Sequence, residues 1–227
     1  MGTDDLFKKR KKERKQRKSE YKQPKINSYL IVTEGERTEP FYFQGIKKKI
    51  EKNIGGMVSV MEVPTIKIHG EGSSTGKLIE IADEIVSRAK IIYQNIWIVF
   101  DKDDFNDFDE AIKIGSEKGY KIAWSNQCFE YWIYLHFNYS DSDLHRSEWN
   151  KKLDQLFYKY SLKNGKYEKN YEDIYNILEE IGGIDTAIKY AKRRMAHFNE
   201  EEGKPSQYAP GTTVYKLVEE LKAYLEE

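Results

Sequence analysis

The stretch IWIVFDKDD, residues 96–104, decides the fold class of this chain. Its first five residues are apolar without alternation, as expected of a central strand that is buried on both faces of a parallel sheet. Its last four residues are charged, and three of them are aspartates. Because ligands of α/β proteins bind at the carboxyl ends of parallel strands, the stretch predicts a buried strand that delivers acidic side chains to a binding edge.

Strand-like and helix-like segments alternate on both sides of this stretch. Strands are predicted at 28–33, 63–68 and 120–124, and helices at 41–50, 78–89 and 108–118. This alternation is typical of βαβ units and predicts an α/β fold with a mostly parallel sheet of about four strands flanked by helices. Beyond Phe129 the apolar spacing is helical throughout. We therefore predict an α/β core at residues 27–126 and a helical region at 127–227 that packs on it.

The charge of the chain is unevenly distributed. The 227 residues include 38 basic and 38 acidic side chains. Residues 1–25 carry 11 basic and 4 acidic side chains, so their net charge is 11 − 4 = +7, and the remainder carries −7. This predicts a disordered or weakly helical basic tail at residues 1–26 that is attracted to phosphate. A merely solubilising arm explains the same charges equally well.

Apolar run lengths and the cysteine count exclude several classes of protein. The longest apolar run, 96–100, is far shorter than the roughly 20 residues that span a bilayer, and no apolar segment follows the basic start of the chain. One cysteine, Cys128, forms neither an internal disulfide nor a cysteine-rich zinc site. We expect a cytoplasmic protein without membrane contact.

Two acidic clusters follow predicted strands. The first contains Glu34, Gly35 and Glu36, and the second contains Asp101, Asp103 and Asp104. Side chains alternate along extended chain, so Asp101 and Asp103 can point to the same side, and Gly35 permits a close approach of the backbone. Crowded carboxylates suit a hard divalent cation, which predicts a Mg²⁺ or Mn²⁺ site. The alternative is that these acids only stabilise helix N-termini.

The same residues resemble a known fold. The Thr33-Glu34-Gly35 segment after one strand and Asp101-x-Asp103 after another look like the acidic signatures of the Toprim fold, which topoisomerases, primases and OLD-type nucleases share. Four segments in order resemble the RloB family of bacterial proteins linked to phage defence. They are VTEGERTEPFYF (32–43), VFDKDDF (99–105), AWSNQCFEYWIYLHF (123–137) and TTVYKLVEEL (212–221). The resemblance covers the chain from about Tyr29 to its end.

The resemblance implies a Toprim-like core and a metal-dependent nuclease. Its catalytic residues would be Glu34, Asp101 and Asp103, and its metal ligands would be Glu34, Asp101, Asp103, Asp104 and Glu130. Glu36, Lys77 and Lys102 are assigned to substrate binding, and Glu36 and Glu39 are further candidates beside the metal. Glu130 could equally be an acid in the first turn of a helix. Family members commonly have Pro where this chain has Gln127, a departure that concerns turn geometry more than chemistry.

Other candidate sites have ordinary interpretations. The segment 69–77 resembles a phosphate-binding P-loop, but its spacing is wrong, so it predicts at most phosphate contacts at a helix start that include Lys77. We expect His136 and Cys128 to be packing residues, although catalysis by His136 stays open. The basic stretch 189–194 either contacts nucleic acid or is a solvated helix face.

The leading hypothesis is that the protein cleaves nucleic acid during abortive infection. RNA is the expected substrate before DNA, and tRNA is one candidate RNA. The alternative is an inactive nucleic-acid-binding or signalling module that keeps the Toprim shape. Primase or topoisomerase activity ranks last, because the chain lacks zinc-finger spacing and is short for strand passage. A homodimer, and a partner protein that activates or restrains the enzyme, stay open.

Overall fold

One sheet with helices on both faces organises the protein. The computed structural model describes residues 24–54, 58–62, 76–102, 106–199 and 203–225. The strands are β1 (Pro24–Thr33), β2 (Val58–Glu62), β3 (Ile92–Asp101), β4 (Lys121–Asn126) and β5 (Gly211–Thr212), in the sheet order β2-β1-β3-β4-β5. Strands β1 to β4 pair in parallel, and β5 is antiparallel to β4. The prediction of an α/β fold with a mostly parallel sheet is confirmed.

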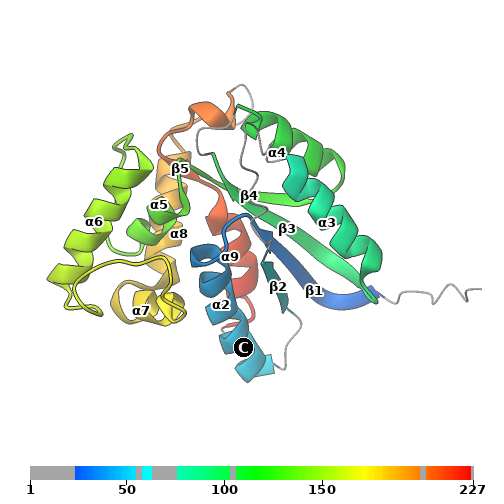
Figure 1. The fold of residues 1–227 in the computed structure, drawn as a ribbon, viewed down its shortest axis with the longest axis horizontal. Coiled ribbons are helices and arrows are strands. Elements are labelled where there is room, and N and C mark those ends of the chain that lie inside the picture. The colour runs from blue at the N-terminus through cyan, green and yellow to red at the C-terminus, as the bar shows by residue number, and fades with distance from the viewer. Residues whose placement is uncertain (1–23, 55–57, 63–75, 103–105, 200–202, 226–227) are drawn as a thin grey trace, which may run out of the picture.

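The helices divide between the sheet and a separate group beside it. They are α2 (Thr38–Ile54), α3 (Gly76–Arg88), α4 (Phe108–Glu117), α5 (Phe129–Leu135), α6 (Arg146–Lys159), α7 (Ile174–Ile181), α8 (Gly183–Met195) and α9 (Val214–Lys222), with the 3₁₀ turn η1 at Pro205–Gln207. Figure 1 shows α3 and α4 on one face of the sheet, α2 and α9 on the other, and α5 to α8 grouped to one side. Within the described ranges, no helix is long and apolar enough to cross a bilayer.

Strand β3 is the centre of the core, as its apolar run predicts. It lies between β1 and β4, and Ile98, Val99 and Phe100 are buried. Burying one such side chain contributes about 1.5–3 kcal/mol, so an uninterrupted apolar run is stable only where both sheet faces are covered. Its neighbour β1 is buried in the same way at Leu30, Ile31 and Val32.

Two predicted elements differ from the structure. The second strand of the sheet is β2 at Val58–Glu62, whereas the predicted strand at 63–68 lies outside the described residues. Both segments carry β-branched residues in alternation, so periodicity alone does not choose between them. The C-terminal region is also not purely helical, because β5 pairs with Ser125 and Asn126. A two-residue strand leaves no periodic signal in the sequence.

The C-terminal helices are tied to the sheet at several points. Helix α7 packs against α2, and α9 packs against β4. The Glu220 carboxylate of α9 accepts hydrogen bonds from Trp97 Nε1 at 3.2 Å and from Lys121 Nζ at 2.7 Å. At the other end of β4, the Asn126 amide donates to the carbonyl oxygens of Pro205 and Ser206 at 3.2 and 3.0 Å. These contacts fix the helical region relative to the strand ends.

Candidate active site

The first pair of acidic side chains meets where β1 and β3 end. The two strands are neighbours, with Thr33 level with Val99. The Glu34 amide donates to the Val99 carbonyl oxygen at 2.9 Å, which holds the chain beside β3 for one residue beyond the strand. Glu34 Oε2 then accepts a hydrogen bond from the Asp101 amide at 3.2 Å. The structure therefore brings together Glu34 and Asp101, two of the three residues predicted to be catalytic.

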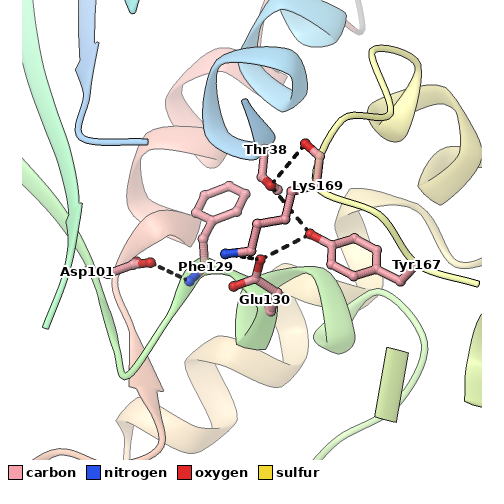
Figure 2. Close-up of polar contacts among 6 residues, drawn as sticks. All are labelled: Thr38, Asp101, Phe129, Glu130, Tyr167 and Lys169. Atoms are coloured by element: carbon pink, nitrogen blue, oxygen red, sulfur yellow. Dashed lines mark hydrogen bonds and ion pairs between the residues drawn. The ribbon is translucent and has the colours of Figure 1, made fainter. Parts of the chain in front are cut away.

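A second backbone contact orients Asp101. Its Oδ2 atom accepts a hydrogen bond from the Phe129 amide at 2.9 Å (Figure 2). Phe129 is the first residue of α5, so this amide is one of the donors that a helix start leaves without a partner inside the helix. A carboxylate is stabilised at such a position by the hydrogen bond and by the helix dipole. Asp101 thus links the end of β3 to the start of α5.

Glu39, in the first turn of α2, is a buried acid beside this pair. Its carboxylate lies against the α-carbon of Gly35, where any added Cβ atom would overlap it. A side chain at position 35 would therefore displace the Glu39 carboxylate from this place. Burial, and next the negative charge of Glu130, raise the pKa of Glu39 to about 7, while a backbone hydrogen bond and Lys169 act in the opposite direction. The charge of Glu34 also raises it, which is consistent with the two acids being close.

A lysine from the helical region completes this acidic cluster. Lys169 Nζ lies 2.9 Å from Glu130 Oε1, and the same oxygen accepts a hydrogen bond from the Tyr167 hydroxyl at 3.2 Å (Figure 2). The Glu130 side chain is 2% exposed, whereas that of Lys169 is 59% exposed. Burial lowers the pKa of Lys169, but Glu130, and more weakly Glu39 and Asp101, outweigh burial and raise it. Lys169 is therefore charged and reaches solvent.

Thr38 joins the loop that carries Lys169 to the start of α2. Its hydroxyl donates to the Lys169 carbonyl oxygen at 3.4 Å and lies 3.5 Å from the Tyr167 hydroxyl (Figure 2). Three parts of the chain, the starts of α2 and α5 and the segment between α6 and α7, thus meet around Glu130. Sequence reasoning missed Thr38, Tyr167 and Lys169. The segment 163–169 reads only as a polar linker, and nothing in it signals its contact with residues far away along the chain.

The remaining predicted site residues are placed unevenly. Asp103 and Asp104 lie outside the described residues. Glu36 is exposed between β1 and α2, Lys77 is half-buried in the first turn of α3, and the Lys102 amide donates to the Ser125 carbonyl oxygen at 2.9 Å. Across the described ranges, no three His, Cys, Asp or Glu side chains are close enough to hold a metal ion. The metal-ligand role of Glu130 stays a prediction.

His136 and Cys128 are both buried, in agreement with a packing role. His136 Nδ1 lies 3.1 Å from the Trp132 carbonyl oxygen and Nε2 lies 3.2 Å from the Tyr42 hydroxyl. A neutral ring that donates from Nδ1 and accepts at Nε2 satisfies both contacts. Burial lowers the pKa of His136 to about 4 and raises that of the Cys128 thiol well above its usual value. The Asn126–Gln127 peptide bond next to Cys128 is cis.

The basic stretch 189–194 is largely engaged by its own chain. Lys192 forms an ion pair with Glu219, and the Arg193 guanidinium lies 4.2 Å from the centre of the Tyr139 ring. Arg194 donates to the carbonyl oxygens of Ala209 and Pro210 at 3.0 and 2.9 Å. These contacts favour a structural role for this face of α8 over a contact with nucleic acid.

Comparison with known proteins identifies one family. A family model described as RloB-like protein matches residues 29–221, which is most of the chain. The four sequence segments that carry the resemblance all lie inside this range. No curated protein and no solved structure matches the chain.

Proposed function

The chain belongs to the RloB-like family, and we propose that it is a metal-dependent nuclease that hydrolyses phosphodiester bonds, in RNA before DNA. The observation that carries the proposal is the hydrogen-bonded placement of Glu34 and Asp101 at the carboxyl edge of a parallel sheet. That edge is the usual binding side of α/β sheets. The Toprim-like character of the core and a role in defence against phage follow from the family resemblance and are part of the proposal.

The donor set suits a hard cation. Glu34 and Asp101 supply carboxylate oxygens, which Mg²⁺ and Mn²⁺ prefer, and Asp103 would be a third ligand. When bound, the cation would neutralise the substrate phosphate and lower the pKa of a bound water. The chain's own part is to hold the ligands in place. The Asp101 amide fixes Glu34, and the Phe129 amide fixes Asp101.

Lys169 adds a positive charge to this edge. Its side chain is more than half exposed and is held by Glu130, so its ammonium can donate to a phosphate oxygen without leaving the cluster. Phosphoryl transfer depends largely on positioning and on charge stabilisation, and a lysine on a neighbouring element supplies both. In this proposal Lys169 contacts the substrate, while Tyr167 and Thr38 position its loop.

The test compares purified protein with variants on total bacterial RNA and on plasmid DNA, with Mg²⁺, with Mn²⁺ and with EDTA. The variants are Asp101→Asn and Glu34→Gln, which keep the size of the side chain and remove its charge. The matched control is Glu110→Gln, an exposed acid of α4. We expect discrete RNA fragments that disappear in EDTA, a loss of at least about 100-fold in both site variants, and parental activity in the control.

The outcomes separate the hypotheses. Cleavage of plasmid alone would assign the substrate to DNA. Equal activity of parent and site variants would show that the site lies elsewhere. If the folded parent binds RNA but cleaves nothing under any condition, the chain is the inactive binding module or requires a partner protein, and repeating the assay in cell extract distinguishes these two.

A further inference from the structure

A pair of exposed tyrosines marks the end of α6. Among the described residues, the large apolar side chains that are exposed are Ile92 at 47%, Tyr158 at 79% and Tyr160 at 40%. Two of these three therefore fall within the tripeptide Tyr158-Lys159-Tyr160. Single exposed apolar residues are common, but two aromatic rings separated by a lysine are a composition typical of surfaces that bind single-stranded nucleic acid.

The contacts of these rings leave most of Tyr158 accessible. Tyr158 lies over Gly165, where an added Cβ atom would be 3.2 Å from its ring. The Tyr160 ring is tilted by 35° against Phe137 at 5.7 Å between centres, and Lys159 Nζ lies 5.1 Å from the centre of the Tyr160 ring. Lys166, in the following turn, is exposed. We call Tyr158, Lys159, Tyr160 and Lys166 the tyrosine–lysine surface.

The charge of this part of the chain favours an anionic partner. Residues 146–169 contain seven Lys or Arg and three Asp or Glu, which gives 7 − 3 = +4 in a chain whose total is zero. Two of the seven basic residues pair with acids outside this range, Lys163 with Asp173 at 2.5 Å and Lys169 with Glu130 at 2.9 Å, which leaves an excess of 5 − 3 = +2. An excess of positive charge next to exposed aromatic rings fits a polymer that carries both phosphates and bases.

The segment that follows α6 leads from this surface to the candidate active site. Positive φ angles at Ser161, Lys163 and Gly165 turn the chain back on itself. The Tyr167 amide then donates to Asp154 Oδ1 at 2.9 Å, which holds the returning chain against α6. Gly165, under the Tyr158 ring, and Lys169 are four positions apart in the chain, so their α-carbons are at most about 14 Å apart. Figure 1 shows α6 at the outer side of the molecule, away from the sheet.

We propose that the tyrosine–lysine surface binds an unpaired stretch of RNA next to the bond that is cleaved. Tyr158 and Tyr160 are two positions apart at the end of a helix, so their rings point to different sides. The RNA strand therefore passes around the end of α6, with one base stacked on each ring and with Lys159 and Lys166 in contact with the phosphates. This inference rests on the proposed function, since it assigns how the same enzyme holds its substrate. Every base has a flat face that can stack on a tyrosine ring, so stacking does not depend on base identity. Because only unpaired bases can be splayed out onto such rings, the surface selects single strands over duplexes.

The experiment measures binding without cleavage. Fluorescence anisotropy of labelled 12-nucleotide single-stranded RNA, in EDTA, is recorded with the full chain and with Tyr158→Ala, Tyr158→Phe and Lys166→Ala. Two further variants are the controls. Ile92→Ala removes an exposed apolar side chain at the start of β3, the end opposite to Asp101, and Lys113→Ala removes an exposed lysine of α4. The basic tail is present in every protein, so differences between them report on the changed residue. Thermal melting confirms that each variant is folded.

We expect Tyr158→Ala to weaken binding about 5- to 100-fold and Tyr158→Phe to bind within about twofold of the parent. Lys166→Ala should reduce the slope of log K against log salt by about 0.7, as for one phosphate contact on a single strand. Single-stranded DNA and duplex RNA of the same length test the choice of ligand. Tight binding of duplex RNA that is insensitive to Tyr158→Ala would overturn the proposal.

Failure of this inference is distinguishable from failure of the proposed function. Parental affinity in Tyr158→Ala, an equal loss in Ile92→Ala, or no measurable binding by the parent each overturns the tyrosine–lysine surface, whatever the nuclease assay gives. A loss in Tyr158→Ala and Lys166→Ala, but not in Ile92→Ala or Lys113→Ala, supports it even if the chain cleaves nothing, and in that case the nuclease proposal alone is wrong.

Discussion

The two halves of the candidate site are built by different rules. Glu34 and Asp101 follow neighbouring strands of one sheet, and their positions result from parallel pairing and from the direction of the strands. Lys169 and Tyr167 belong to an irregular segment between α6 and α7, and they reach Glu130 only because that segment folds back on α6. The acidic half of the site is therefore set by regular strand pairing, and the basic half by packing between elements that are distant in sequence.

The largest expected effect is on the free energy of unfolding, and it tests whether the α/β core and the C-terminal helical region unfold together. Phe100 in β3 and Phe157 in α6 are both fully buried, so changing either one to Ala should lower the free energy of unfolding by about 3–5 kcal/mol. Because α2 packs on α7 and α9 packs on β4, we expect one cooperative transition in both variants, measured by circular dichroism in urea. A separate early transition in Phe157→Ala alone would show that the helical region unfolds by itself.

The next effect is the pH dependence contributed by His136, where α5 meets α2. Its folded pKa of about 4 lies below the usual value of 6.5, so the unfolded chain binds the proton more tightly. Stability from this residue is therefore complete above about pH 6.5 and is lost as the pH falls toward 4, by roughly 3 kcal/mol in total. The raised pKa of Glu39 contributes a slope of opposite sign in the same pH range, so the slope from His136 is read as a difference between two proteins. Urea melts of the parent and of His136→Gln between pH 4 and 7 should differ by this slope, because Glu39 is present in both. The same slope in the variant would assign it to other groups.

A smaller effect isolates the contact between the two halves of the site. Lys169→Ala leaves the buried carboxylate of Glu130 without its cation, and we expect the free energy of unfolding to fall by about 1–3 kcal/mol, since half of the lysine is solvated. Adding Glu130→Gln should restore part of the loss in a double-mutant cycle, because the amide oxygen still accepts from Tyr167. The control is Lys113→Ala, which breaks an exposed ion pair with Glu117 in α4 and should change the free energy of unfolding by less than about 0.5 kcal/mol.

The sequence was informative where side chains are periodic or follow a strand. The apolar run 96–100 predicts a buried central strand, which the structure confirms as part of β3. Acidic residues follow both this run and the strand predicted at 28–33, which predicts that they lie at one edge of the sheet. The structure confirms this placement for Glu34 and Asp101. It was less informative where alternation is ambiguous, as between 58–62 and 63–68, and where an element is as short as β5. Periodicity needs several residues before it distinguishes a strand from a turn.

The residue pattern alone was enough for the α/β class, the family and the acidic residues at the ends of two strands, because alternating strand and helix patterns are local and imply parallel strands. The tertiary structure was needed to show that Lys169 pairs with Glu130, that Glu39 is buried against Gly35, and that Tyr158 is exposed. These features depend on the path of chain segments between elements. That path is set by side-chain packing across long sequence separations, which no local pattern of residues records.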